Sequence, residues 1–186
     1  MKNNMKKKLP IGISDFKEII ERDYYYFDKT KFIENLLEDG FKVNLFTRPR
    51  RFGKTLNMSM LKYFFDIEKK DENRRLFENL YIFKSEYFEK QGNYPVISIS
   101  FRTYGAQDWE NGFKSVKETI SNLYGKYKFL TEKMDEIKIE KFNFIRKGID
   151  SANWKSSLFN LSKYLYKYYG KKVVILIDEY DQSIID

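Results

Sequence analysis

The segment at residues 48–55 most constrains the fold of this 186-residue chain, because it places a basic turn between two different hydrophobic patterns. It reads Arg-Pro-Arg-Arg-Phe-Gly-Lys-Thr and follows the largely apolar run Val43–Phe46. Apolar residues then recur at helical spacing, at Leu56, Met60, Leu61 and Phe64. The pattern predicts a strand over residues 42–47, then a turn, and then a helix.

This turn contains the residue types that bind a nucleoside triphosphate. Backbone N–H groups of a loop that closes onto a helix N-terminus attract phosphate, and Gly53 allows a close approach. Lys54 supplies a cation, and Thr55 supplies a hydroxyl for Mg²⁺. The residues predicted to contact the nucleotide are Arg48, Pro49, Arg50, Arg51, Phe52, Gly53, Lys54, Thr55 and Leu56.

The turn departs from the usual G-x-x-x-x-G-K-[ST] pattern at its first position, which is Arg48. Pro49 favours an extended backbone at Arg48, where a side chain is tolerated. The alternative interpretation is a strand, a basic turn and a core helix that bind no ligand.

A second candidate segment lies near the end of the chain. Val173–Ile177 is a run of five aliphatic residues that predicts a strand buried on both faces of a parallel sheet. We expect Asp178 to bind Mg²⁺ together with Thr55. We expect Glu179 to orient or deprotonate the attacking water, which makes Glu179 and Lys54 the predicted catalytic residues. The alternative role for Asp178 is a helix N-cap.

Five stretches in this order resemble the bacterial AAA-ATPase-like family of predicted P-loop ATPases. They are residues 9–16 (LPIGISDF), 24–30 (YYYFDKT), 48–55 (RPRRFGKT), 94–101 (YPVISISF) and 177–181 (IDEYD). The family also lacks the first glycine of the phosphate loop, so Arg48 fits the resemblance. The resemblance implies ATP as ligand, Mg²⁺ as cofactor and ATP hydrolysis by the full-length protein. Members often continue into a region similar to PD-(D/E)XK nucleases.

Strands that alternate with helices predict an α/β fold, a P-loop three-layer sandwich with a mainly parallel sheet. We expect residues 1–186 to be the N-terminal part of such a domain, truncated after the Asp-Glu strand. Its predicted parts are a helical and aromatic lead-in at 1–41, the phosphate-loop strand and helix at 42–65, and the second strand, an insertion and the Asp-Glu strand at 94–186.

The expected truncation gives a prediction about strand order. The strands at 96–101 and 173–177 should pair in parallel. The strand at 42–47 should not pair with 173–177, because a later strand of the sheet separates them in ATPases that carry an Asp-Glu pair. Direct pairing of these two would favour a P-loop kinase or GTPase.

Composition limits the chemistry that is available. The chain has no cysteine and no histidine, which excludes disulfides, thiol or imidazole catalysis and ordinary zinc sites. No aliphatic run is long enough for a membrane span, and Lys6–Lys8 is not followed by a signal-peptide apolar region. We therefore expect a cytoplasmic protein.

Two other classes of function stay open. One is an interaction module that is gated by nucleotide and has no turnover. The other is a nucleic-acid-binding domain, since the net charge is +8 and Arg48, Arg50 and Arg51 form a basic cluster. ATP is the expected partner, while DNA, bound through a further C-terminal region, and a second copy of the chain are open alternatives.

Overall fold

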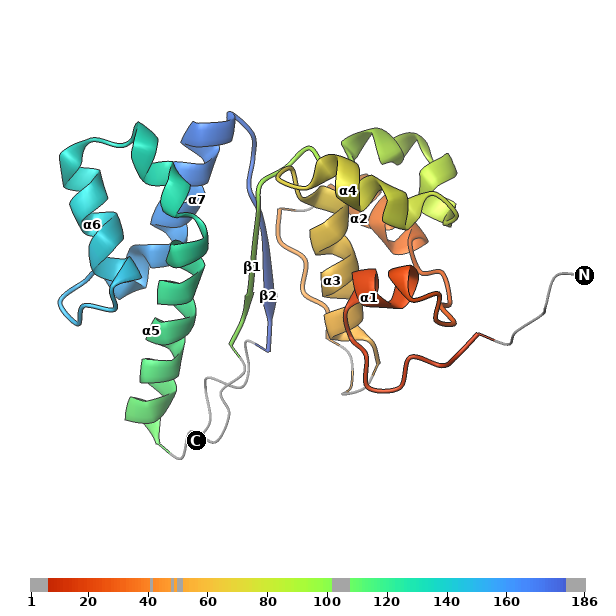
Figure 1. The fold of residues 1–186 in the computed structure, drawn as a ribbon, viewed down its shortest axis with the longest axis horizontal. Helices are drawn as coiled ribbons and strands as arrows, with labels where there is room; N and C mark the ends of the chain where they lie inside the picture. The colour runs from red at the N-terminus through yellow and green to blue at the C-terminus, as the bar shows by residue number, and fades with distance from the viewer. Residues whose placement is uncertain (1–6, 41, 48, 50–51, 102–107, 180–186) are drawn as a thin grey trace, which may run out of the picture. The chain divides into compact units, whose positions relative to one another are not determined.

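The computed structural model describes residues 7–40, 42–47, 49, 52–101 and 108–179. The chain divides into two compact units, Met1–Tyr94 and Pro95–Asp186, called here unit one and unit two (Figure 1). Helices occur in both units, and a parallel strand pair occurs in unit two. The predicted α/β class is therefore confirmed.

Unit one is built from short helices around an aromatic core. Its elements are α1 (Phe16–Glu21), α2 (Lys31–Asp39), α3 (Lys54–Phe65), α4 (Lys70–Arg74) and the 3-10 turns η1 (Arg75–Phe77), η2 (Tyr81–Lys84) and η3 (Glu86–Lys90). The rings of Phe16, Phe64 and Phe77 are fully buried. Phe77 stacks on Phe16 and meets Phe64 edge to face, with ring centroids 5.1 and 5.4 Å away, so α1, α3 and η1 share one core.

The first two helices begin and end where local sequence signals place them. Asp15 caps α1, because its Oδ1 accepts a hydrogen bond of 2.9 Å from the Glu18 N–H. Gly40 ends α2 in the left-handed conformation, with φ of 61°. Both features follow from the residue types at these positions, since aspartate is a good N-cap and glycine readily adopts the left-handed conformation.

The predicted strand at residues 42–47 is not formed. No residue of this segment joins a β-ladder, and Val43 and Leu45 are 86% and 66% exposed. Phe46 packs edge to face on Phe32 of α2, with ring centroids 4.9 Å apart. A strand needs a neighbouring strand for its backbone hydrogen bonds, so an apolar run without a ladder does not become one.

Unit two is a parallel strand pair joined by helices. Its elements are β1 (Val96–Ser100), α5 (Trp109–Lys126), η4 (Lys128–Lys133), α6 (Glu136–Arg146), η5 (Trp154–Ser156), α7 (Ser157–Tyr169) and β2 (Val174–Asp178). The ladder runs in register from Val96 opposite Val174 to Ser100 opposite Asp178. The predicted parallel pairing of these two segments is therefore confirmed.

The strand pair is covered on one face by the helices of unit two (Figure 1). Ile97 and Ile99 are buried in a core that also contains Leu161 and Leu165 of α7. Ile175 and Ile177 of β2 remain 43% and 39% exposed. The expectation of a strand buried on both faces was therefore wrong, because a side chain that alternates away from the helices finds no second layer in this unit.

Two tyrosines of unit two join neighbouring elements through their hydroxyls. The buried Tyr127 donates to the Val96 carbonyl of β1 over 2.5 Å, and Tyr124 donates to the Ser157 carbonyl of α7 over 2.7 Å. The insertion predicted within residues 94–186 includes the segment 126–150, which contains η4 and α6. None of the helices in the described ranges is long and apolar enough to cross a membrane.

Candidate functional site

The predicted phosphate-binding residues lie at the start of α3. Gly53 precedes this helix with φ of 75°, and its carbonyl accepts the first helical hydrogen bond, from Asn57 N–H over 2.9 Å. Lys54, Thr55 and Leu56 form the first turn. The helix therefore begins as the sequence predicts, at Lys54 and directly after Gly53.

The left-handed backbone explains why glycine stands at position 53. Residues with a Cβ rarely adopt this φ, at a cost of about 1–2 kcal/mol. The first amide groups of a helix have no acceptor within the helix and lie at the positive end of its dipole. The first turn of α3 contains no acidic residue, so this end favours an anion.

The rest of the predicted loop is described only in part. Pro49 and Phe52 are exposed. Arg48, Arg50 and Arg51 lie outside the described residues. Their predicted contacts with nucleotide remain predictions.

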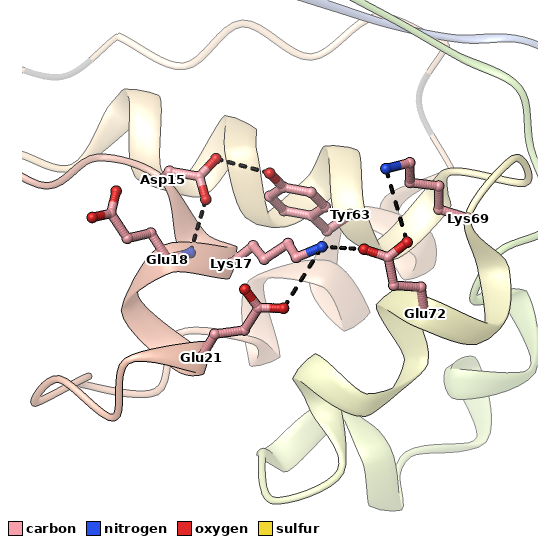
Figure 2. Close-up of polar contacts among 7 residues, drawn as sticks. All are labelled: Asp15, Lys17, Glu18, Glu21, Tyr63, Lys69 and Glu72. Carbon is pink, nitrogen blue, oxygen red and sulfur yellow. Dashed lines mark hydrogen bonds and ion pairs between the residues drawn. The ribbon is translucent and has the colours of Figure 1, made fainter.

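Helix α3 is held in unit one by its buried face and by a polar cluster at its side. Met60, Leu61, Phe64 and Phe65 are buried. Figure 2 shows Asp15 directed at both the Glu18 N–H and the Tyr63 hydroxyl, which donates to Asp15 Oδ2 over 2.9 Å. The Phe16 N–H donates to Ser59 Oγ over 3.0 Å. The start of α1 is thus attached to two successive turns of α3.

A second group of contacts in Figure 2 joins α1 to α4. Lys17 pairs with Glu72 and lies 3.6 Å from Glu21, and Lys69 lies 3.8 Å from Glu72. The hydrogen bond with Glu72 raises the pKa of Lys17, and the same contact lowers the pKa of Glu72. Lys17 is half-buried, but its carboxylate partners and Lys69 are exposed, so the ion pairs contribute little free energy compared with the aromatic core.

The two predicted acidic residues lie at the carboxyl end of β2 in unit two. Asp178 is opposite Ser100, and its carbonyl accepts a hydrogen bond of 3.1 Å from Phe101 N–H. Its side chain is half-buried, and its Oδ1 accepts from Glu179 N–H over 3.1 Å. Carboxylates at this end of parallel strands are in the usual place for ligand and metal binding in α/β proteins.

Glu179 has an unusual backbone conformation. Its φ is 54°, in the left-handed region that few residues other than glycine adopt. Such conformations are enriched at functional sites, where the surrounding structure maintains them. The catalytic role of Glu179 remains a prediction. The alternative helix cap at Asp178 depends on residues 180–186, which lie outside the described residues.

Thr55 and Asp178 are the two residues predicted to hold Mg²⁺, and this role remains a prediction. Among the described residues, no group of three or more acidic, histidine or cysteine side chains could hold a metal by itself. Mg²⁺ is usually bound by one or two carboxylates together with substrate phosphates and waters. Thr55 belongs to unit one and Asp178 to unit two.

The predictions from sequence missed one residue near the predicted phosphate loop. An ideal Cβ built on Gly53 would lie 3.9 Å from Nζ of Lys29, a residue of the segment between α1 and α2. The signal available in the sequence was the stretch Asp28-Lys29-Thr30, which contributed to the family resemblance without an assigned role.

Comparison with known proteins supports the resemblance. The chain is 32% identical over 183 residues to a protein of Azotobacter chroococcum mcd 1 called "Uncharacterized protein in vnfD 5'region". The match covers 97% of this chain and 30% of that relative, so the chain spans about a third of the relative's length. No solved structure matches the chain significantly. A family model described as "Predicted AAA-ATPase" matches residues 10–186, and the chain therefore belongs to this AAA-ATPase-like family.

Proposed function

We propose that this chain binds ATP with Mg²⁺ and that the full-length protein hydrolyses the nucleotide. The observation that carries the proposal is the start of α3, where a left-handed Gly53 is followed directly by Lys54 and Thr55. The family match over residues 10–186 supports a nucleotide as the ligand. The proposal includes a P-loop sandwich, of which β1 and β2 are two parallel strands.

Each candidate residue has a role that follows from its chemistry. The backbone of residues 48–56 surrounds the phosphates, and Lys54 neutralises their charge. Thr55 and Asp178 hold Mg²⁺, which supplies charge stabilisation for the phosphoryl group when bound. Glu179 orients the attacking water and accepts its proton.

Titration calorimetry with ATP and MgCl₂ tests the binding step. Lys54→Ala removes a charge-assisted contact and should weaken ATP binding about tenfold or more. Lys62→Ala is the matched control, because Lys62 lies in the last turn of the same helix, and it should bind ATP as the wild type does. Equal affinities for all three proteins would exclude the assignment of Lys54.

The dependence on metal separates this proposal from a nucleic-acid-binding domain. ATP should raise the melting temperature in MgCl₂, and EDTA should remove most of the shift. A protein that contacts only nucleic-acid backbone should give no such shift. Nucleotide binding that persists in Glu179→Gln of the full-length protein, with loss of turnover, would assign Glu179 to the chemical step.

A further inference from the structure

We propose that Lys29 is a second phosphate-binding cation of the nucleotide site, supplied by the segment between α1 and α2. The inference rests on the proposed ATP site and adds one residue to it. Its first support is distance, because Lys29 Nζ lies 3.9 Å from the place that a Cβ of Gly53 would occupy. Gly53 is the glycine at which the loop is expected to approach phosphate most closely.

The backbone on both sides of Lys29 is firmly attached to unit one. Asp28 Oδ1 accepts from the N–H and the hydroxyl of Thr30, over 2.8 and 2.7 Å. Asp28 Oδ2 accepts from Tyr81 N–H over 2.7 Å, and Thr30 Oγ1 accepts from Ile82 N–H over 3.1 Å. Thr30 is fully buried. The two flanking residues therefore hold the turn against η2, while Lys29 between them is exposed.

The same turn is also in contact with α3. The Tyr26 hydroxyl donates to Sδ of the buried Met60 over 3.4 Å. The ring of Tyr26 lies edge to face on Phe16, with centroids 5.4 Å apart. Residues 26–30 thus pack against α1 and the middle of α3, and this packing places Lys29 in the same unit as Gly53.

The charge balance at this place favours an anion. The ammonium of Lys29 lies near the positive end of the α3 dipole, and Lys54 adds a second positive charge in the first turn. Within the described ranges, no carboxylate is within salt-bridge distance of Lys29. Two positive charges at a helix N-terminus repel each other when no anion is bound. A bound polyphosphate compensates them.

The role of Lys29 follows from this geometry. Its long side chain contacts a phosphate oxygen of the nucleotide, so cations from two segments bind one anion. Affinity should therefore depend on the number of phosphates, with ATP above ADP and ADP above AMP. Lys29 contributes to binding and not to proton transfer.

Calorimetry with three variants tests the role of Lys29. Lys29→Gln should weaken binding of ATP with Mg²⁺, and of inorganic tripolyphosphate, about tenfold. Lys29→Arg keeps the charge and should stay within about threefold of the wild type. Lys31→Gln removes an equal charge two residues away, at a side chain that lies over the Tyr81 ring, and should change affinity less than twofold.

The outcomes distinguish this inference from the proposed function. If the wild type does not bind ATP, both fail. If Lys54→Ala weakens binding while Lys29→Gln behaves like Lys31→Gln, the inference fails alone. If Lys29→Gln weakens ATP but not tripolyphosphate, Lys29 contacts the nucleoside and the inference is wrong.

A measurement on the unmodified chain makes the test independent of folding of the variants. Acetylation by a succinimide ester, followed by mass spectrometry, reports the accessibility of each lysine. ATP with Mg²⁺ should protect Lys29 and Lys54 at least fivefold, and Lys31 should react equally with and without ATP. Unchanged labelling of Lys29 at saturating ATP would overturn the inference.

Discussion

The start of α3 and the end of β2 carry the two halves of the proposed site, and different interactions build them. The helix start needs only its own backbone hydrogen bonds, a left-handed Gly53 and a buried apolar face. The end of β2 depends on a partner strand, since Asp178 occupies its place through the ladder with β1. The segment 42–47, which has an apolar pattern and no ladder, shows what happens without such a partner. Helical parts of a site form locally, and strand parts form only with their neighbours.

The largest effect on stability is expected from removing a buried side chain that packs α3 into the core of unit one. Phe64 is fully buried, and its ring meets Phe65, Phe77 and Phe88. Phe64→Ala should lower the free energy of unfolding by about 3–5 kcal/mol, measured by urea titration. Phe52→Ala, at a ring that is 59% exposed, is the control and should change it by less than about 0.5 kcal/mol. Equal effects of the two changes would contradict this description of the core.

A smaller effect is expected from the tyrosine that joins the Lys29 turn to α3. Burial raises the pKa of Tyr26 from 10.0 to about 12. The folded state thus favours the neutral phenol. This preference contributes fully to the free energy of unfolding below pH 10 and is lost as the pH rises toward 12. Between pH 10 and 12 the free energy of unfolding should therefore fall less in Tyr26→Phe than in the wild type. The difference should be roughly 1 kcal/mol after allowance for solvent screening.

Urea titrations at several pH values measure this difference. The two proteins should have parallel stability profiles between pH 7 and 9, where the phenol is neutral in both folded and unfolded chains. Profiles that stay parallel up to pH 12 would show that Tyr26 is not the group responsible.

The smallest effect concerns the backbone at the end of β2. Because Glu179 has φ of 54°, Glu179→Gly should leave the free energy of unfolding unchanged or raise it by up to about 1 kcal/mol. Glu140→Gly, in the interior of α6, should instead lower it by about 1 kcal/mol. If both changes are equally destabilising, Glu179 is not in a left-handed conformation in solution.

The substitution Glu179→Gly also tests the predicted catalytic role of this residue. In the full-length protein Glu179→Gly should abolish ATP hydrolysis while the fold is kept. Hydrolysis at the wild-type rate would remove Glu179 from the proposed chemical step.

Local features of the fold could be predicted because neighbouring residues determine them. The cap at Asp15, the end of α2 at Gly40 and the start of α3 after Gly53 each depend on a few consecutive residues. The parallel pairing of β1 with β2 was predicted from the strand order of ATPases that carry an Asp-Glu pair. The roles of Lys54, Asp178 and Glu179 in catalysis or metal binding stay predictions.

Features that depend on distant neighbours could not be predicted in the same way. The segment 42–47 has a strand-like sequence, but whether it forms a strand depends on a neighbouring strand. Ile175 and Ile177 of β2 are exposed because no second layer in the described part of unit two covers their face. The place of Lys29 beside Gly53 depends on hydrogen bonds from Asp28 and Thr30 to η2. A single sequence contains no periodic signal for such contacts.

The central claim is that the start of α3 and the end of β2 bind the same nucleotide with its metal ion. Nuclear magnetic resonance of the ¹⁵N-labelled chain with ATP and Mn²⁺ tests it directly, because Mn²⁺ broadens only signals of nearby amides. We predict strong broadening of both Thr55 and Asp178 at low Mn²⁺, with Gly148 unaffected and no broadening when Mg²⁺ replaces Mn²⁺. Broadening of Thr55 without Asp178, or of neither residue, would contradict the account.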